Sequence, residues 1–219
     1  MEGIARKALL DLDAHARPDA IEDDWIAHFF DKCRLISDDE MQSLWARVLA
    51  GEANLPGKSS KRTVDLLASL DKADAAMFAN LCRFVVFVGD EPYPLVFDLA
   101  EPLYHEHGIN FEFLSHLDTI GLIRLDGGGR FFLKEMGAEV FLSYFGERLR
   151  VELSSGELAI GYTLMTKAGV QLSGVCNAQP VDAFLELARA TLIASGHAVE
   201  SISPSESLPP TKTPAAKDN

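Results

Sequence analysis

The sequence predicts an α+β protein that is mostly α, with a helical module at residues 23–88 followed by an α/β module at residues 89–202. In the first module apolar residues recur every three to four positions, which is the spacing of amphipathic helices. After residue 88, short β-branched or alternating runs are separated by glycine turns, which is typical of strands. A chain of 219 residues is long enough for two such modules.

Residues 1–22 are predicted to form a helical extension that precedes the first module. Ile4, Ala8 and Leu12 have helical spacing, and Pro18 disfavours helix at the residue before it. We expect this extension either to dock on the helical module or to fray.

The first two helices of the helical module are predicted from their ends as well as from their periodicity. Trp25 and Phe29 mark the apolar face of the first helix, and we expect Asp23 or Asp24 to cap its start. Ser37-Asp38-Asp39-Glu40 fits a capping box for the second helix, with Ser37 as the cap and Glu40 reaching back.

Two further helices complete the module. Gly51 lies where a left-handed residue would end the second helix, and Pro56-Gly57 predicts a turn after it. A third amphipathic run follows from Thr63, and Asp71 is expected to cap a fourth helix.

The α/β module contains an order of elements similar to the second half of a winged helix. A helix at Asn110–Ile120 precedes a strand at Leu122–Leu125, a glycine turn and a returning strand at Arg130–Leu133. The helix that would enter a DNA groove carries Glu112 and Asp118 and no Lys or Arg, although DNA-reading helices normally bring positive charge. We therefore interpret this winged-helix-like module as a protein-interaction or structural domain.

The remaining segments are predicted to complete this module and to end in a disordered tail. A strand pair turns at Gly146, Pro180 fits the first position of a last helix, and residues 198–202 form an edge strand. Residues 203–219 hold four of the ten prolines and almost no apolar residues, so we expect them to be disordered.

Composition argues against two classes of partner. The net charge of −13 disfavours nucleic acid as the main partner, because phosphate binding depends on Lys and Arg. No apolar run reaches the roughly 20 residues that span a bilayer, and the start lacks the apolar core of a secretory signal. We expect a cytoplasmic protein without membrane association.

No catalytic motif is present, so we expect the protein not to be an enzyme and to need no cofactor or metal. His105 and His107 are candidate metal ligands, but residues two apart share a face only on a strand. Carboxylates at 22–24, 31 and 38–40 are better explained by helix capping and solvated faces than by a cation site. Cys33 and Cys82 lie on apolar faces and are interpreted as buried thiols.

Lys58, Lys61 and Arg62 form the one compact basic cluster of the sequence, at the start of the third helix. Such a cluster can contact an anion, a nucleic-acid backbone or an acidic partner, and it can also be a solvated loop. We treat these three residues as the candidate partner site.

Several short motifs together resemble an uncharacterised bacterial family known as a domain of unknown function. They are Asp24-Trp25, Phe29-Phe30-Asp31-Lys32, Ser37-Asp38-Asp39-Glu40-Met41-Gln42, Leu44-Trp45, Leu49-Ala50-Gly51-Glu52, Pro56-Gly57 and Ser60-Lys61-Arg62-Thr63. The resemblance implies a bacterial cytoplasmic protein and brings no catalytic residues. Similar helical segments occur in proteins linked to abortive infection, which is a defence against phage.

Two functions remain open on the sequence alone. The first is a protein-interaction module with an unidentified protein partner, in phage defence or a stress response. The alternative is a winged-helix-type regulator that binds nucleic acid.

Overall fold

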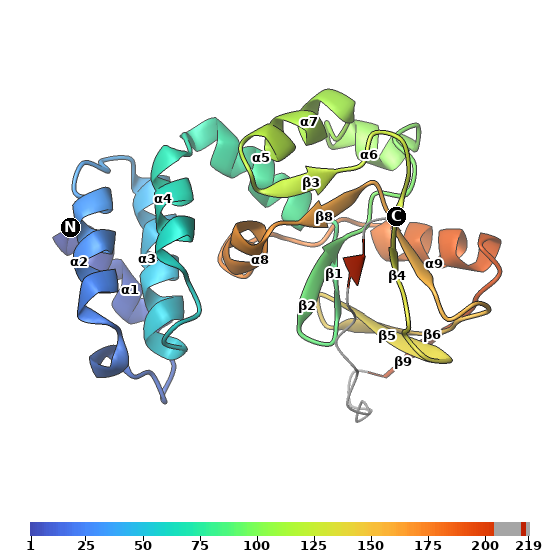
Figure 1. Cartoon of the computed structure of the whole chain (residues 1–219), viewed down its shortest axis with the longest axis horizontal. Coiled ribbons are helices and arrows are strands. Elements are labelled where there is room, and N and C mark those ends of the chain that lie inside the picture. Colours follow the sequence, from blue (N-terminus) through green and yellow to red (C-terminus); the bar gives the residue numbers. More distant parts are fainter. Residues whose placement is uncertain (204–215, 218–219) are drawn as a thin grey trace. The chain divides into compact units, whose positions relative to one another are not determined.

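The structure is a computed structural model that describes residues 1–203 and 216–217 (Figure 1). These residues form nine α-helices, two short 3₁₀-helices and ten strands. The α+β, mostly α fold class is therefore confirmed. The chain divides into two compact units, with residues Met1–Phe78 and Lys167–Asn177 in unit 1 and the remaining residues in unit 2.

Unit 1 is entirely helical among the described residues. Its rings stack in one core, because Phe29 lies 5.1 Å from both Trp25 and Trp45. The N-terminal helix packs on α3 and buries Ile4 completely, so the extension docks and does not fray. The elements are α1 (Glu2–Ala8), η1 (Leu9–Asp11), η2 (Pro18–Ala20), α2 (Asp23–Cys33), α3 (Asp39–Asn54), α4 (Lys61–Ser69), the first part of α5 (Lys72–Cys82) and α8 (Lys167–Ser173).

The cap of α3 differs from the predicted one. Asp38, and not Ser37, is the capping residue, and its carboxylate accepts a hydrogen bond from the Met41 amide at 3.0 Å. With the cap at residue 38, Glu40 falls in the first turn and cannot reach back, so it pairs with Lys72 at 2.9 Å. The predicted capping box is therefore wrong by one residue.

Two other helix ends in unit 1 are corrected. Gly51 does not end α3, because its carbonyl accepts from the Leu55 amide and the helix continues to Asn54. The cap position of α2 is Glu22, so Asp23 and Asp24 lie in the first turn and no side chain caps it. The predicted cap of α5 is confirmed, since the Asp71 carboxylate accepts from the amide at residue 74 at 2.8 Å.

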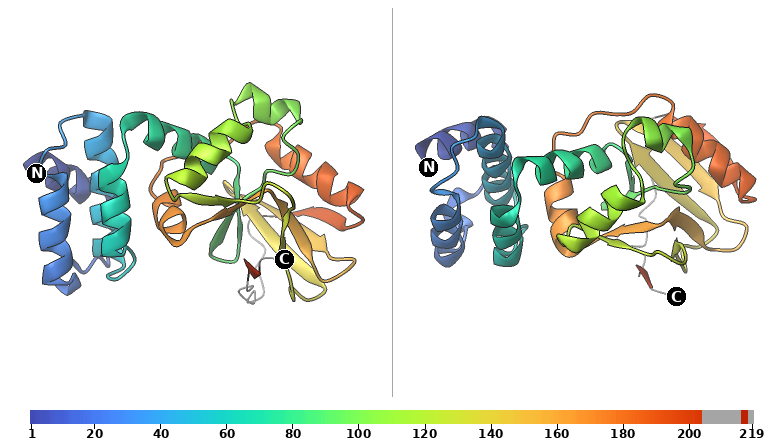
Figure 2. Two further views of the ribbon diagram at one scale, coloured as in Figure 1. Left: turned by 45° about the horizontal axis from the view of Figure 1, so that its top comes forward. Right: turned by 90° about the horizontal axis from the view of Figure 1, so that it is seen from above.

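Unit 2 is built on a five-stranded antiparallel sheet with α9 (Phe184–Ala194) along one face (Figure 2). The Phe184 ring lies 5.0 Å from Tyr144 of the sheet and 5.1 Å from Phe84, which joins the helix to the core. The strand order is β2 (Glu91–Pro94), β1 (Val85–Val88), β5 (Glu139–Tyr144), β6 (Glu147–Glu152) and β9 (Ala198–Ile202).

The predicted hairpin of the winged-helix-like module does not form. β3 (Ile123–Leu125) pairs with β8 (Thr163–Met165), and β4 (Phe131–Leu133) pairs with β7 (Leu158–Gly161) and β10 (Ala216–Lys217). The two strands beside the glycine turn therefore belong to different sheets, because each finds its partner more than 20 residues away. The preceding helices are α6 (Pro102–Glu106) and α7 (Phe111–Thr119), and α7 matches the predicted helix.

The strand pair β5–β6 is the hairpin that unit 2 does form. Phe145 and Gly146 join its strands with φ values of 43° and 91°, as a two-residue turn with left-handed backbone requires. α9 begins after Ala183 and not at Pro180, so the predicted start of the last helix is wrong. The edge strand at 198–202 is confirmed.

The predicted module boundaries differ from the units found. The division between the units falls within α5, and α8 returns to unit 1, so residues 23–88 and 89–202 do not match them. The predicted extension at 1–22 is part of unit 1. The predicted disordered tail at 203–219 lies mostly outside the described residues.

Candidate functional site

The basic cluster lies on the loop that joins α3 to α4 and on the first turn of α4. Lys58 is exposed in the loop, and Lys61 and Arg62 are the first two residues of the helix, also exposed. Lys61 pairs with Asp24 at 3.6 Å. In the described part of the chain neither Lys58 nor Arg62 forms an ion pair. The structure thus keeps the three cations within one short segment.

A buried carboxylate holds this loop in place. Glu52 is only 2% exposed, and its two oxygens accept hydrogen bonds from the amides of Gly57 at 2.5 Å and Ser59 at 2.7 Å. On the other side the indole of Trp25 donates to the Ser59 carbonyl at 2.7 Å. Because buried polar groups that lose a partner are costly, these bonds fix the backbone that presents the cations.

The loop and α4 are also tied to α8. Gln171 accepts from the Ser60 amide at 3.2 Å and from the Thr63 hydroxyl, while Arg47 donates to the Val175 carbonyl at 2.5 Å. The Lys58 ammonium lies 3.9 Å from where a Cβ of Gly51 or Gly174 would stand, which is an ordinary van der Waals distance. Lys58 therefore lies beside the chain that leaves α8.

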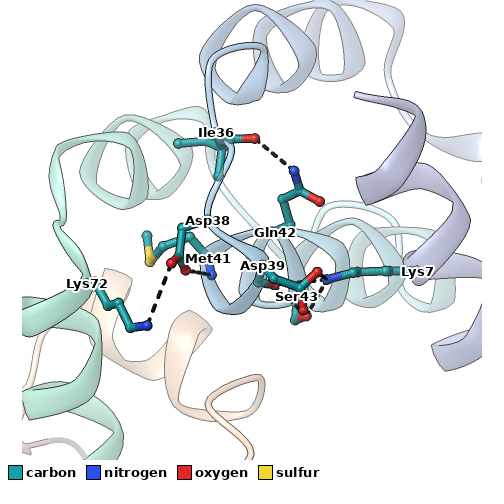
Figure 3. A network of polar contacts seen from close by, with 8 residues as sticks. All are labelled: Lys7, Ile36, Asp38, Asp39, Met41, Gln42, Ser43 and Lys72. Carbon is teal, nitrogen blue, oxygen red and sulfur yellow. Dashed lines mark hydrogen bonds and ion pairs between the residues drawn. The ribbon is translucent and has the colours of Figure 1, made fainter.

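The start of α3 carries a second polar network, shown in Figure 3. Lys7 binds the Asp39 carboxylate at 2.6 Å and the Ser43 hydroxyl at 2.9 Å, and the Gln42 amide donates to the Ile36 carbonyl at 3.0 Å. Lys72 lies 3.6 Å from Asp38. Each charged group here already has a partner, so this network joins α1, α3 and α5 and leaves no free group for a ligand.

These contacts shift two ionisation equilibria at the start of α3. The hydrogen bond from the Met41 amide lowers the pKa of Asp38 below its ordinary value, against an opposing effect of desolvation and with a smaller contribution from Lys72. A hydrogen bond to Glu40 raises the pKa of Lys72. Both shifts favour the charged forms, as capping and ion pairing require.

A third polar group joins α2 to α4. Asp65 lies 2.9 Å from Lys32 and 3.0 Å from the ring of His28. The hydrogen bond from Lys32 lowers the pKa of Asp65, and the same bond raises the pKa of Lys32. All three side chains are partly exposed, so they are a surface cluster between helices and make only a small contribution to stability.

The two histidines considered as metal ligands lie at the end of α6, in different surroundings. His105 is exposed on the helix, whereas the ring of His107 packs on Phe84 and its Nδ1 accepts from Arg83 at 3.2 Å. Among the residues that the structure describes, no three His, Cys, Asp or Glu side chains gather as a metal ion would need. His107 is thus engaged with its neighbours.

The thiols and phenols with perturbed ionisation are buried core groups. Burial raises the pKa of the Cys33 thiol, which is fully enclosed in unit 1. In unit 2, burial raises the pKa of Tyr93 to about 12 and raises the pKa of Tyr104, whose hydroxyl donates to the Leu95 carbonyl at 2.8 Å. Such shifts suppress the reactive anionic forms, so these groups are inert at neutral pH.

Sequence reasoning identified the cations and missed what holds them. Glu52, Trp25 and Gln171 come from three separate segments, and no spacing rule connects them. One signal was present, because Trp25 and Glu52 both belong to the motifs that carry the family resemblance.

The fold and the site define a two-unit α+β protein with a fixed basic loop on its helical unit. In the described part of the chain, no helix is long and apolar enough to cross a membrane. The sequence pattern of the DUF2806 family, described as a protein of unknown function, matches residues 1–188, and the chain belongs to this family. No curated protein and no solved structure matches the chain.

Proposed function

We propose that this protein is a non-enzymatic bacterial interaction module, located in the cytoplasm, that binds a protein partner through Lys58, Lys61 and Arg62. The observation that carries the proposal is the fixed loop, in which Glu52 and Trp25 hold the backbone while Lys58 and Arg62 form no ion pair with any residue that the structure describes. A loop that is ordered before binding loses less entropy when a partner docks. Because similar helical segments occur in abortive-infection proteins, we propose that this binding acts in phage defence.

The proposal is tested by affinity capture from bacterial extracts with the full-length protein and with Arg62→Glu. Arg34→Glu is the matched control, because Arg34 is an exposed arginine of the same unit outside the basic cluster. We expect Arg62→Glu to reduce the captured partner at least tenfold and Arg34→Glu to leave it unchanged. Equal capture by all three proteins contradicts a role for the cluster.

Phage sensitivity is the cellular test. A strain that lacks the gene is expected to become more sensitive to at least one phage, and the wild-type gene is expected to restore resistance where the Arg62→Glu gene does not. Unchanged sensitivity across a phage panel argues against the defence role and leaves the binding role to the capture experiment.

A second candidate is the winged-helix-type nucleic-acid regulator, and one observation favours it. α7 is followed directly by β3, as a recognition helix is followed by a strand in a winged helix, although β3 pairs with the distant β8 and not with β4. Against it, α7 has no Lys or Arg, and its Asp118 accepts a hydrogen bond from the Leu125 amide. A gel shift at low salt that is lost with Lys61→Glu and Arg62→Glu supports this candidate, and absence of binding at low salt removes it.

A further inference from the structure

Three exposed leucines lie at the same end of unit 1 as the basic cluster. Leu9, Leu10 and Leu55 are 68%, 84% and 59% exposed. The segment after η1 is held against the end of α3, because the Asn54 side chain donates to the Asp11 carbonyl at 3.1 Å and accepts from the Asp13 amide at 2.9 Å. Since Leu55 directly follows Asn54, and Leu9 and Leu10 directly precede Asp11, the three leucines lie at one end of the helices.

This end, at the lower end of α2, α3 and α4 in Figure 1, comprises residues 9–24 and 53–62 and is called the leucine end below. The Arg17 amide donates to the Ala53 carbonyl at 2.7 Å, and the Trp25 indole reaches the Ser59 carbonyl at 2.7 Å. These bonds hold the two ranges side by side.

The leucine end carries both signs of charge, and they lie in separate ranges. Residues 9–24 hold six carboxylates and one cation, whereas residues 53–62 hold three cations and no carboxylate. Two copies that each carry a charge of −13 repel one another over most of their surfaces. The repulsion is offset where the acidic range of one copy faces the basic range of the other.

A contact between two identical surfaces has to be complementary to itself. A patch with an apolar centre and both signs of charge around it meets this condition, because the acidic segment of one copy can face the basic cluster of the other. An apolar centre with a polar rim is also the usual anatomy of a protein interface.

We infer that the leucine end docks a second copy of this chain, with Leu9, Leu10 and Leu55 at the centre of a two-fold contact. Asp19 and its acidic neighbours in one copy face Lys58 and Arg62 of the other. This inference rests on the proposed function, because it names the partner of the same surface.

The test is sedimentation velocity on the full-length protein over a range of concentrations. We expect the wild-type protein to reach the mass of a dimer, and Leu10→Glu to shift the self-association constant at least a hundredfold towards monomer. Leu35→Glu is the matched control, because Leu35 is 82% exposed and lies in the segment between α2 and α3, away from the leucine end. Circular dichroism of each variant checks that it folds.

Charge supplies a second readout that does not depend on the leucines. Arg62→Glu is expected to weaken self-association about tenfold, and added salt is expected to weaken it in the wild-type protein but less in this variant. A wild-type monomer at every concentration, or a dimer that Leu10→Glu leaves intact, overturns the inference.

Failure of the second-copy inference and failure of the proposed function give different results. A monomer that still captures a different protein in an Arg62-dependent way overturns the second copy as partner and supports the proposed function. A dimer that dissociates with Leu10→Glu and captures no other protein supports the inference and narrows the proposed function to self-association.

Discussion

The contacts that stabilise unit 1 internally differ in kind from those that stabilise unit 2 internally. In unit 1, helices formed from neighbouring residues are joined by a ring stack, by caps and by ion pairs between their surfaces. In unit 2, strands far apart in sequence come together, as in the pairing of β3 with β8 and of β6 with β9. The difference implies that unit 1 tolerates the loss of most single polar groups, whereas unit 2 depends on a few backbone positions.

Gly161 should give the largest effect of any single change. Its φ is 102°, and a Cβ at this position would overlap the Val96 carbonyl. Val96 forms a β-bridge with Gly161, and its carbonyl accepts a hydrogen bond from the Tyr162 amide at 3.0 Å. Gly161→Ala is therefore expected to destabilise the protein by about 4 kcal/mol or more.

Chemical denaturation of Gly161→Ala measures this loss. Gly127→Ala is the control, because Gly127 has open space around its Cβ position and is not among the glycines with positive φ. Equal stability of both variants would show that unit 2 does not depend on the close approach at Gly161.

The core of unit 1 should give the next largest effect. Phe29 is fully buried and touches the rings of Trp25, Phe30 and Trp45. Phe29→Ala is expected to cost about 3–5 kcal/mol, because it removes a buried ring and leaves a cavity. Hydrogen exchange resolved along the chain is the measurement, and a loss of protection in α2 and α3 of unit 1 that exceeds the loss in β5 and β6 sharpens the comparison.

A single cap in unit 1 should matter less. The Ser60 hydroxyl accepts from the Thr63 amide at 3.2 Å at the start of α4. Ser60→Ala is expected to cost about 1 kcal/mol, as for other lost helix caps, while Ser60→Asp keeps most of the stability. Urea midpoints of the two variants measure the difference, and a loss as large as that of Phe29→Ala would contradict the modest role of caps.

The smallest effect concerns the pH dependence at the start of α3. Because the Met41 amide lowers the pKa of Asp38, its carboxylate adds stability above its unfolded pKa of 3.8 and loses this contribution as the pH falls through the lower folded value. Asp38→Asn is therefore expected to be less stable than wild type at pH 7 and equally stable once the pH is below the folded pKa of Asp38. A stability difference that is the same at both pH values contradicts the assignment of Asp38 as a charged cap.

The same contrast explains how far the sequence predicted the structure. In unit 1 the helices from α1 to α5 follow from local spacing, and errors within them concern their ends, such as the shift of the cap from Ser37 to Asp38. In unit 2 most strands were located correctly. However, Leu122–Leu125 and Arg130–Leu133 were predicted to pair with each other, whereas the structure pairs them with β8 and β7. Partner choice between strands depends on long-range packing, which local patterns do not record.

The candidate site shows a similar limit. Lys58, Lys61 and Arg62 were identified because they are adjacent in sequence. The contact of α8 with Ser60 through Gln171 depends on a return of the chain from residue 167 onward. Nothing local in the sequence indicates that return.

Photo-crosslinking in cells can show directly whether the end of unit 1 where α3 is joined to α4 is a binding surface. A photoreactive amino acid replaces Leu55 in one full-length protein and Leu35 in another, since both leucines are exposed. The account predicts a crosslinked adduct from position 55 and none from position 35, with the adduct mass separating a second copy from a different protein. Adducts from position 35 alone, or equal adducts from both positions, would contradict it.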